Sequence, residues 1–167
     1  MLIRISSDGD RAEILALYPL MFPDEELRPM VSELLDRRRD VLSLVACASS
    51  APVAHLLFTL FDDDGGALLG PLGVRPDHQG QGVGSTLVDE GLARLSRTGV
   101  RQVFVLGDPN YYGRFGFTPE RGTLPPYPLP PEWADAWQSV CLAGRQPMGE
   151  GPCVLPDVWM KPELWGP

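Results

Sequence analysis

Three glycines at alternate positions separate an apolar run from an amphipathic segment in the middle of the chain. The apolar run covers residues 67–74, the glycines are Gly80, Gly82 and Gly84, and apolar residues at helical spacing follow from Gly84 to Leu95. Residues 100–106 contain too few polar side chains for an exposed strand. We therefore expect strand, loop, helix and strand, which is a βαβ unit with parallel strands and a right-handed crossover.

The glycine loop has the properties of an anion cradle. Glycines let the backbone approach a ligand closely and turn several N–H groups the same way, and a helix start adds partial positive charge. A P-loop would require a lysine followed by serine or threonine, and no lysine stands near this loop. A dinucleotide site, with Asp108 as its acidic residue, would require G-x-G-x-x-G in the first βαβ unit, whereas these glycines alternate and lie in mid-chain.

Residues 74–84, Val-Arg-Pro-Asp-His-Gln-Gly-Gln-Gly-Val-Gly, closely resemble the acetyl-CoA signature of the GNAT N-acetyltransferases. A second match covers residues 110–117, where Tyr112 precedes a Gly-Phe pair by four residues, as in the late GNAT segment. The combination of Leu106-Gly107-Asp108-Pro109 with Tyr111-Tyr112 and Phe115-Gly116-Phe117 looks most like the YhbS-type branch of predicted acetyltransferases. The resemblance is specific over residues 67–117 and looser elsewhere.

The resemblance implies a single α/β domain over residues 1–167 with the GNAT fold. That fold has a mixed sheet of about six or seven strands with helices on both faces. It also implies an acetyl-CoA cosubstrate and direct transfer of acetyl to a primary amine in a ternary complex. The amine belongs to a small molecule or a peptide, and the protein is a monomer or a homodimer.

The same resemblance assigns binding residues. Backbone amides in the loop and at the helix start would hold the pyrophosphate, and the strand before them would pair with pantetheine and the thioester carbonyl, with the Val74 N–H as oxyanion donor. The residues concerned are Leu72, Gly73, Val74, Gln79, Gly80, Gln81, Gly82, Val83, Gly84, Ser85 and Thr86.

Tyr112 stands at the position of the family's proton donor to the CoA sulfur. A phenol can fill that role because its pKa of about 10 exceeds that of a thiol. The alternative is a tyrosine that only packs on a short helix.

The general base is not assigned by the sequence. Many relatives carry a glutamate on the strand before the valine, but residues 68–72 include no ionisable group. His55, Asp108, a water chain or an amine that is already neutral on binding remain open, and a strand histidine is more often a hydrogen-bonded core residue. The missing glutamate also leaves open a non-catalytic domain that binds acyl-CoA as a sensor, and the signature does not fix the acyl group.

Composition limits the partners. The chain has 167 residues and a formal net charge of −8, which opposes nonspecific nucleic-acid binding and favours a cationic acceptor. No apolar run is long enough to span a membrane, so we expect a cytoplasmic protein. Three widely spaced cysteines favour buried thiols over disulfides or a metal site.

Two sets of side chains are candidates for ligand contacts. The candidate donors to a phosphate are Arg75, His78, Arg97, Arg101 and Arg114. The candidate acceptor-binding side chains are Phe22, Asp24, Glu25, Glu26, Tyr127, Trp133 and Trp137.

The remaining elements are expected from local patterns. We expect strands over 2–5, 41–48, 53–61, 138–142 and 153–159. Asp8 or Asp10 should cap a first helix that Pro19 and Pro23 break, and a second helix should cover about 24–38. Turns are expected over 49–52 and 62–66, and a proline-rich loop over 119–131.

Overall fold

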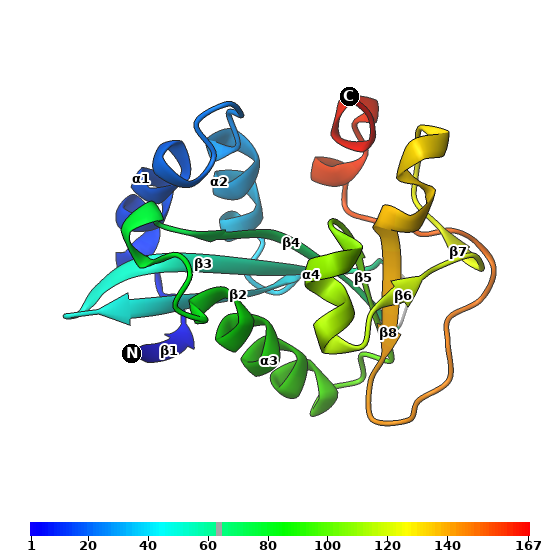
Figure 1. Cartoon of the computed structure of the whole chain (residues 1–167), viewed down its shortest axis with the longest axis horizontal. Coiled ribbons are helices and arrows are strands. Elements are labelled where there is room, and N and C mark those ends of the chain that lie inside the picture. The colour runs from blue at the N-terminus through cyan, green and yellow to red at the C-terminus, as the bar shows by residue number, and fades with distance from the viewer. Residues whose placement is uncertain (63–64) are drawn as a thin grey trace. The chain divides into compact units, whose positions relative to one another are not determined.

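The computed structural model describes residues 1–62 and 65–167. In these residues seven strands form one mixed sheet in the order β1-β2-β3-β4-β5-β8-β6, and β7 pairs with β9 (Figure 1). The strands are β1 (Leu2–Ile5), β2 (Val41–Ala48), β3 (Ala51–Leu60), β4 (Gly66–Val74), β5 (Gln102–Leu106), β6 (Thr118–Pro119), β7 (Thr123–Leu124), β8 (Trp137–Cys141) and β9 (Gly151–Pro152). The α-helices are α1 (Arg11–Met21), α2 (Arg28–Asp36), α3 (Val83–Ser96) and α4 (Pro109–Tyr112).

The chain forms two compact units. Unit 1 consists of residues 1–59 and 70–91, and unit 2 consists of residues 60–69 and 92–167. Strand β4 and helix α3 each begin in one unit and end in the other. Each unit is described separately below.

Unit 1 is built on the antiparallel strands β1, β2 and β3. Ser49 and Ser50 have φ of 50° and 72°, so a two-residue turn joins β2 to β3 and is shorter than the 49–52 turn expected from the sequence. Alternate residues of β3 point to opposite faces: His55 contacts Tyr18 of α1, whereas the Phe58 ring occupies the space beside Gly91 of α3. Helices α1 and α3 therefore cover opposite faces of this part of the sheet (Figure 1).

The first two helices of unit 1 differ from expectation. Pro19 lies inside α1, which continues to Met21, because the buried residues Ile14, Leu17 and Tyr18 hold the helix on the sheet. The Asp10 carboxylate accepts bonds from Arg4 at 2.6 and 2.8 Å and from the Ser7 N–H at 2.7 Å, so it does not cap α1.

Helix α2 begins at Arg28 rather than at residue 24 and ends at Asp36 rather than at 38. Pro29 lies in its first turn, the position where a missing N–H and a fixed φ cost least. The expected start was four residues too early because acidic residues before a proline resemble a first helical turn.

Unit 2 contains the second half of the βαβ motif. Residues Gly66, Ala67 and Leu68 of β4 pair in parallel with Gln102, Val103 and Phe104 of β5, which confirms the expected parallel pair, and β8 then pairs antiparallel with β5. The rings of Phe61, Phe104 and Trp137 stack in its core at centroid separations of 5.2 and 5.5 Å.

Three further expectations fall in unit 2. Residues 153–159 do not form the expected strand: β9 covers Gly151–Pro152 and a 3-10 turn covers Asp157–Trp159, because Pro156 leaves no N–H for a strand ladder. Two short strands, β6 and β7, interrupt the proline-rich loop. Of the turn expected over 62–66, residues 63 and 64 lie outside the described residues, and Gly65 has φ of +109°.

Cys47 and Cys153 are buried, as expected, whereas Cys141 at the end of β8 is exposed. Its position at the last residue of a strand takes its side chain out of the core. No helix in the described part of the chain is long and apolar enough to cross a membrane.

Candidate functional site

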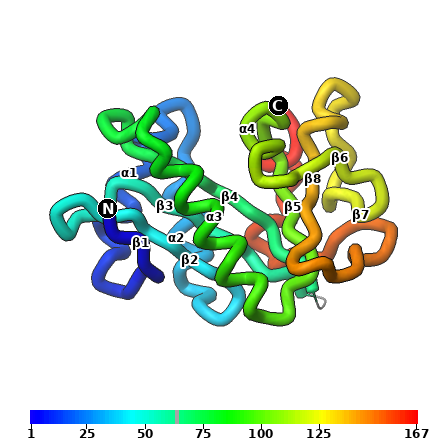
Figure 2. Tube along the Cα trace, turned by 60° about the horizontal axis from the view of Figure 1, so that its bottom comes forward, coloured from blue at the N-terminus to red at the C-terminus, as the bar shows by residue number. Residues whose placement is uncertain are grey.

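The glycine loop lies in unit 1 between a short 3-10 turn, Pro76–His78, and the start of α3 (Figure 2). Gly80 and Gly82 have φ of +74° and +80°, in the left-handed region that favours glycine. A Cβ added at either residue would meet no atom within 4 Å. These two glycines are therefore needed for the backbone conformation, and the space beside them stays open.

The backbone N–H groups at residues 80–85 of this loop have no hydrogen-bond acceptor among the described residues. Within the described residues, the N–H groups of residues 80–85 donate to no backbone carbonyl, and the first bond of the helical ladder runs from the Thr86 N–H to the Gly82 carbonyl at 3.0 Å. The Thr86 hydroxyl donates to the same carbonyl at 2.8 Å. Unpaired amides at a helix start bind anions readily, so the cradle expected from the sequence is present as backbone geometry.

Side chains hold the loop against the strand before it. The Gln79 side-chain amide donates to the Val74 carbonyl at 3.0 Å. Arg75, a candidate phosphate donor, instead pairs with Asp77 at 2.6 Å, and this contact lowers the pKa of the Asp77 carboxyl. Arg75 therefore has its charge matched locally, and the open amides are the stronger anion ligands.

The end of β4 is covered by helix α1. A Cβ on Gly73 would lie 2.7 Å from Sδ of Met21 and 2.9 Å from Cε2 of Phe22, so a larger residue there would have to displace these two side chains. Phe22 also lines a hollow of about 310 Å³ together with the acidic residues Asp24, Glu25 and Glu26. Glu26 pairs with Arg28. The sequence singled out Phe22 and the acids, but it gave no sign of the contact with Gly73.

His55 is a core residue rather than a base at a surface. It is fully buried, its Nδ1 lies 2.7 Å from the Tyr18 hydroxyl and its Nε2 lies 2.8 Å from the Ser43 hydroxyl. Burial lowers its pKa to about 3. The imidazole is therefore neutral at physiological pH and both ring nitrogens have partners.

Asp108 is exposed and acts as the cap of α4. Its carboxylate accepts the Asn110 N–H at 2.9 Å, the usual arrangement at a helix start. The structure thus gives this aspartate a local role.

Tyr112, in unit 2, packs on the backbone just after β5. A Cβ on Gly107 would lie 2.5 Å from Cε2 of Tyr112, and the Tyr112 ring meets Phe117 edge-on at 5.8 Å. Among the described residues its hydroxyl has no hydrogen-bond partner. Burial raises the pKa of this hydroxyl above its usual value, so the group carries its proton at physiological pH.

The structure thus brings residues 72–74 and 79–86 together in unit 1 and describes Tyr112 separately in unit 2. A mixed sheet, a βαβ unit and a row of open amides at a mid-chain helix start define an α/β protein with a backbone site suited to an anion.

The Acetyltransferase (GNAT) family profile matches residues 11–117, and the chain belongs to this family. It is 35% identical over 167 residues to the uncharacterized N-acetyltransferase YjhQ of Escherichia coli strain K12, covering 92% of each chain. The protein is therefore an N-acetyltransferase enzyme, and the family's acetyl-CoA is its cosubstrate.

Two solved structures support the same fold. The crystal structure of E. coli YhbS in complex with CoA matches with a TM-score of 0.83 and 27% identity over 96% of this chain and 92% of that one. A Brucella melitensis GNAT acetyltransferase in complex with acetyl-CoA matches with a TM-score of 0.75 and 28% identity, covering 94% and 96%. The expected family and fold class are thereby confirmed, and the sheet of seven strands lies within the expected six or seven.

Proposed function

We propose that the whole chain acts as one acetyltransferase domain that moves an acetyl group from acetyl-CoA to a primary amine by direct attack in a ternary complex. The row of unpaired amides over residues 80–85 carries this proposal. Six N–H groups beside two glycines that leave open space suit the oxygens of a pyrophosphate. Two homologues crystallised with CoA or acetyl-CoA support the same ligand.

The reaction forms a C–N bond and breaks the thioester C–S bond. Negative charge develops on the carbonyl oxygen, for which the Val74 N–H is the proposed donor, and the departing thiolate takes a proton from Tyr112. Tyr112 suits this role because its hydroxyl is protonated and has no partner in the described residues. The ring packing against Gly107 would hold the hydroxyl in place.

The amine must lose a proton before or during attack. His55 is unsuited because it is completely buried and already bonded at both ring nitrogens. Asp108 is occupied as a helix cap. We therefore propose that the proton leaves through water, or that the amine binds in its neutral form.

A thermal-shift screen with acetyl-CoA, longer acyl-CoAs, NAD and ATP tests the ligand, because a ligand that binds only the native state raises the melting temperature. We expect stabilisation by acetyl-CoA and none by NAD. Release of CoA thiol with a panel of primary amines then tests turnover. Tight CoA binding without turnover on any amine would identify an acyl-CoA sensor instead.

A further inference from the structure

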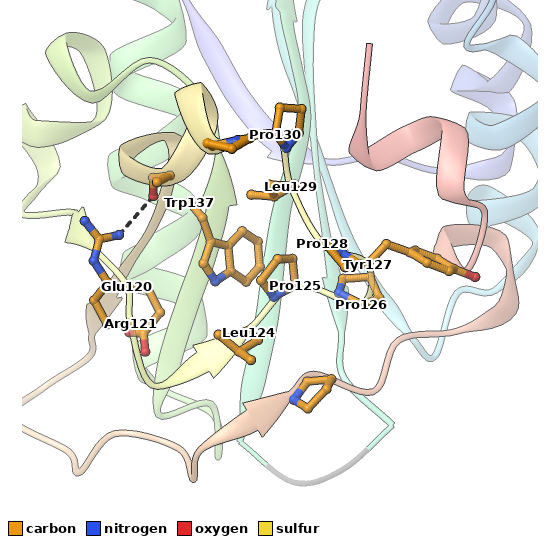
Figure 3. Close-up of a pocket in the computed structure, with 13 residues that line it drawn as sticks. Glu120, Arg121, Leu124, Pro125, Pro126, Tyr127, Pro128, Leu129, Pro130 and Trp137 are labelled. Atoms are coloured by element: carbon orange, nitrogen blue, oxygen red, sulfur yellow. Dashed lines mark hydrogen bonds between the residues drawn. The ribbon is translucent and has the colours of Figure 1, made fainter.

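Unit 2 contains an apolar hollow that none of the roles proposed above uses. It has a volume of about 400 Å³ and lies between the segment 124–131 and the indole of Trp137 (Figure 3). Pockets that bind small organic molecules measure about 300–1,000 Å³ and have mainly apolar walls. The sequence singled out Tyr127 and Trp137, but the proline-rich segment was expected only as a loop.

The two charged residues at its edge are both hydrogen-bonded within the protein. Glu120 accepts bonds from Gln102, Ser139 and the backbone N–H groups of Gly122 and Thr123 at 2.6 to 3.1 Å. Arg121 donates to Asp135 at 2.7 Å and to the Ala134 carbonyl at 3.0 Å. The hollow thus offers a ligand a mainly apolar surface, at whose edge both charged side chains already have hydrogen-bond partners.

Proline residues limit the backbone freedom of its walls, because the ring of each proline fixes φ. The prolines that line the hollow are Pro125, Pro126, Pro128, Pro130, Pro131 and Pro152. The Trp137 indole is 2% exposed and is held by its N–H bond to the Thr123 carbonyl at 2.9 Å. A rigid hollow of this kind binds a ligand at low cost in lost flexibility.

The hollow lies beside the C-terminal end of β5, and the segment that contains Tyr112 follows that end. Leu106, the last residue of β5, pairs with Trp137. The next residue, Gly107, donates to the Ala136 carbonyl at 2.9 Å and supports the Tyr112 ring. One wall of the hollow and the proposed proton donor are therefore built on neighbouring residues of unit 2.

Trp137 and the segment that follows Tyr112 lie on opposite faces of this strand pair. Trp137 and Phe104 share one face, since their rings stack and their strand positions have the same parity. Val140 lies on the other face, beneath Gly116 of the segment that follows Tyr112.

We propose that this hollow binds the aromatic group of an arylalkyl primary amine, which is the acetyl acceptor. The inference rests on the proposed function. In the step, the amine nitrogen bonds to the acetyl carbon, the thioester C–S bond breaks, one amine proton goes to water, the thiolate takes a proton from Tyr112 and Tyr112 regains its proton from water. The products are an N-acetyl arylalkylamine and CoA.

Steady-state kinetics with matched amines tests the acceptor class. Tryptamine and 2-phenylethylamine carry rings, whereas propylamine and putrescine offer a similar amine without one. We expect at least a tenfold higher kcat/KM for the ring-bearing pair, because burial of an apolar group separates related substrates by about 10- to 200-fold. A tripeptide with N-terminal tryptophan is tested as a further substrate. Efficient turnover of it would show that the acceptor is a peptide rather than a free arylalkylamine.

Ala134→Phe tests the location. Ala134 is exposed and lines the hollow, so a phenyl group there would fill it and raise the KM for tryptamine at least tenfold. The KM for acetyl-CoA and the melting temperature should not change. Ala12→Phe, at an exposed position in the first turn of α1, is the matched control. If Ala134→Phe proves unstable, Leu124→Ser, at a residue 44% exposed, serves as the second variant.

The outcomes separate the inference from the proposed function. Turnover of amines without preference for a ring, or an unchanged tryptamine KM in Ala134→Phe, overturns the inference and leaves the enzyme assignment intact. Stabilisation of the protein by tryptamine that Ala134→Phe abolishes, with no turnover, would keep the ligand site and reject the acetyl acceptor.

Discussion

The Tyr18 hydroxyl and the Nδ1 atom of His55 lie 2.7 Å apart in the interior of unit 1. This contact joins helix α1 to strand β3 and places a titratable ring where no water reaches it. Ser43 bonds to the other ring nitrogen and to Ser6, whose hydroxyl lies 2.7 Å away. Each of these four side chains therefore has a hydrogen-bond partner within the network. The main role of the network is to fix α1, and with it Phe22, over the end of β4.

His55 should make the folding stability depend on pH. Its pKa is about 3 in the folded protein and about 6.5 in an unfolded chain. The unfolded state therefore binds more protons between these values, and the stability is complete above pH 6.5 and falls by about 1 kcal/mol per pH unit as pH decreases toward 3. Urea unfolding at pH 7, 6 and 5 measures this slope.

His55→Gln is the control for that slope, since an amide can bridge Tyr18 and Ser43 but does not titrate. We expect a lower stability at pH 7 and a flatter profile below pH 6.5. Parallel profiles for the two proteins would assign the pH dependence to other groups.

Tyr112→Phe should reduce kcat by about 100-fold or more, the scale of general acid catalysis, with little change in the melting temperature or in binding of acetyl-CoA. The phenyl ring keeps the packing on Gly107, so only the proton donor is lost. Tyr111→Phe is the matched control, because Tyr111 stacks with Arg114 at 4.5 Å through its ring rather than its hydroxyl. Equal kcat values for the two variants would leave Tyr112 a packing residue.

The part of the site that is local in sequence could be predicted. Alternating glycines before an amphipathic helix fix positive φ at Gly80 and Gly82 and leave the amides open, because both properties depend on neighbouring residues. For the same reason β1, β2 and the parallel pair of β4 and β5 were predicted correctly.

Features that depend on distant contacts could not be predicted. Pro19 ends helices in isolation, but here packing of α1 on the sheet outweighs its missing hydrogen bond. Asp10 looks like a cap and is instead engaged by Arg4 from β1. The hollow beside Trp137 arises only when residues 120–137 and Pro152 meet, and no local pattern indicates it.

Gly91→Ala should destabilise the protein by about 1–3 kcal/mol, the usual cost of overpacking. A methyl group there would overlap the Phe58 ring, which lies buried on the face of β3 that α3 covers. Gly99→Ala is the control, since a Cβ at Gly99 meets nothing within 4 Å. Denaturant unfolding of both variants tests the packing of α3, and a smaller loss for Gly91→Ala than for Gly99→Ala would contradict it.

Gly82→Asp should abolish binding of acetyl-CoA while the fold survives. A Cβ there meets no protein atom within 4 Å, so the main cost to stability is the left-handed backbone, about 1 kcal/mol and less for aspartate than for most residues. Its carboxylate, however, would lie among the amides that face the pyrophosphate and would repel it. Gly144→Asp imposes the same strain at φ of +69° in an equally open position far along the chain. Isothermal titration with acetyl-CoA should therefore show loss of binding in Gly82→Asp alone, and an unchanged affinity there would place the pyrophosphate outside the glycine loop.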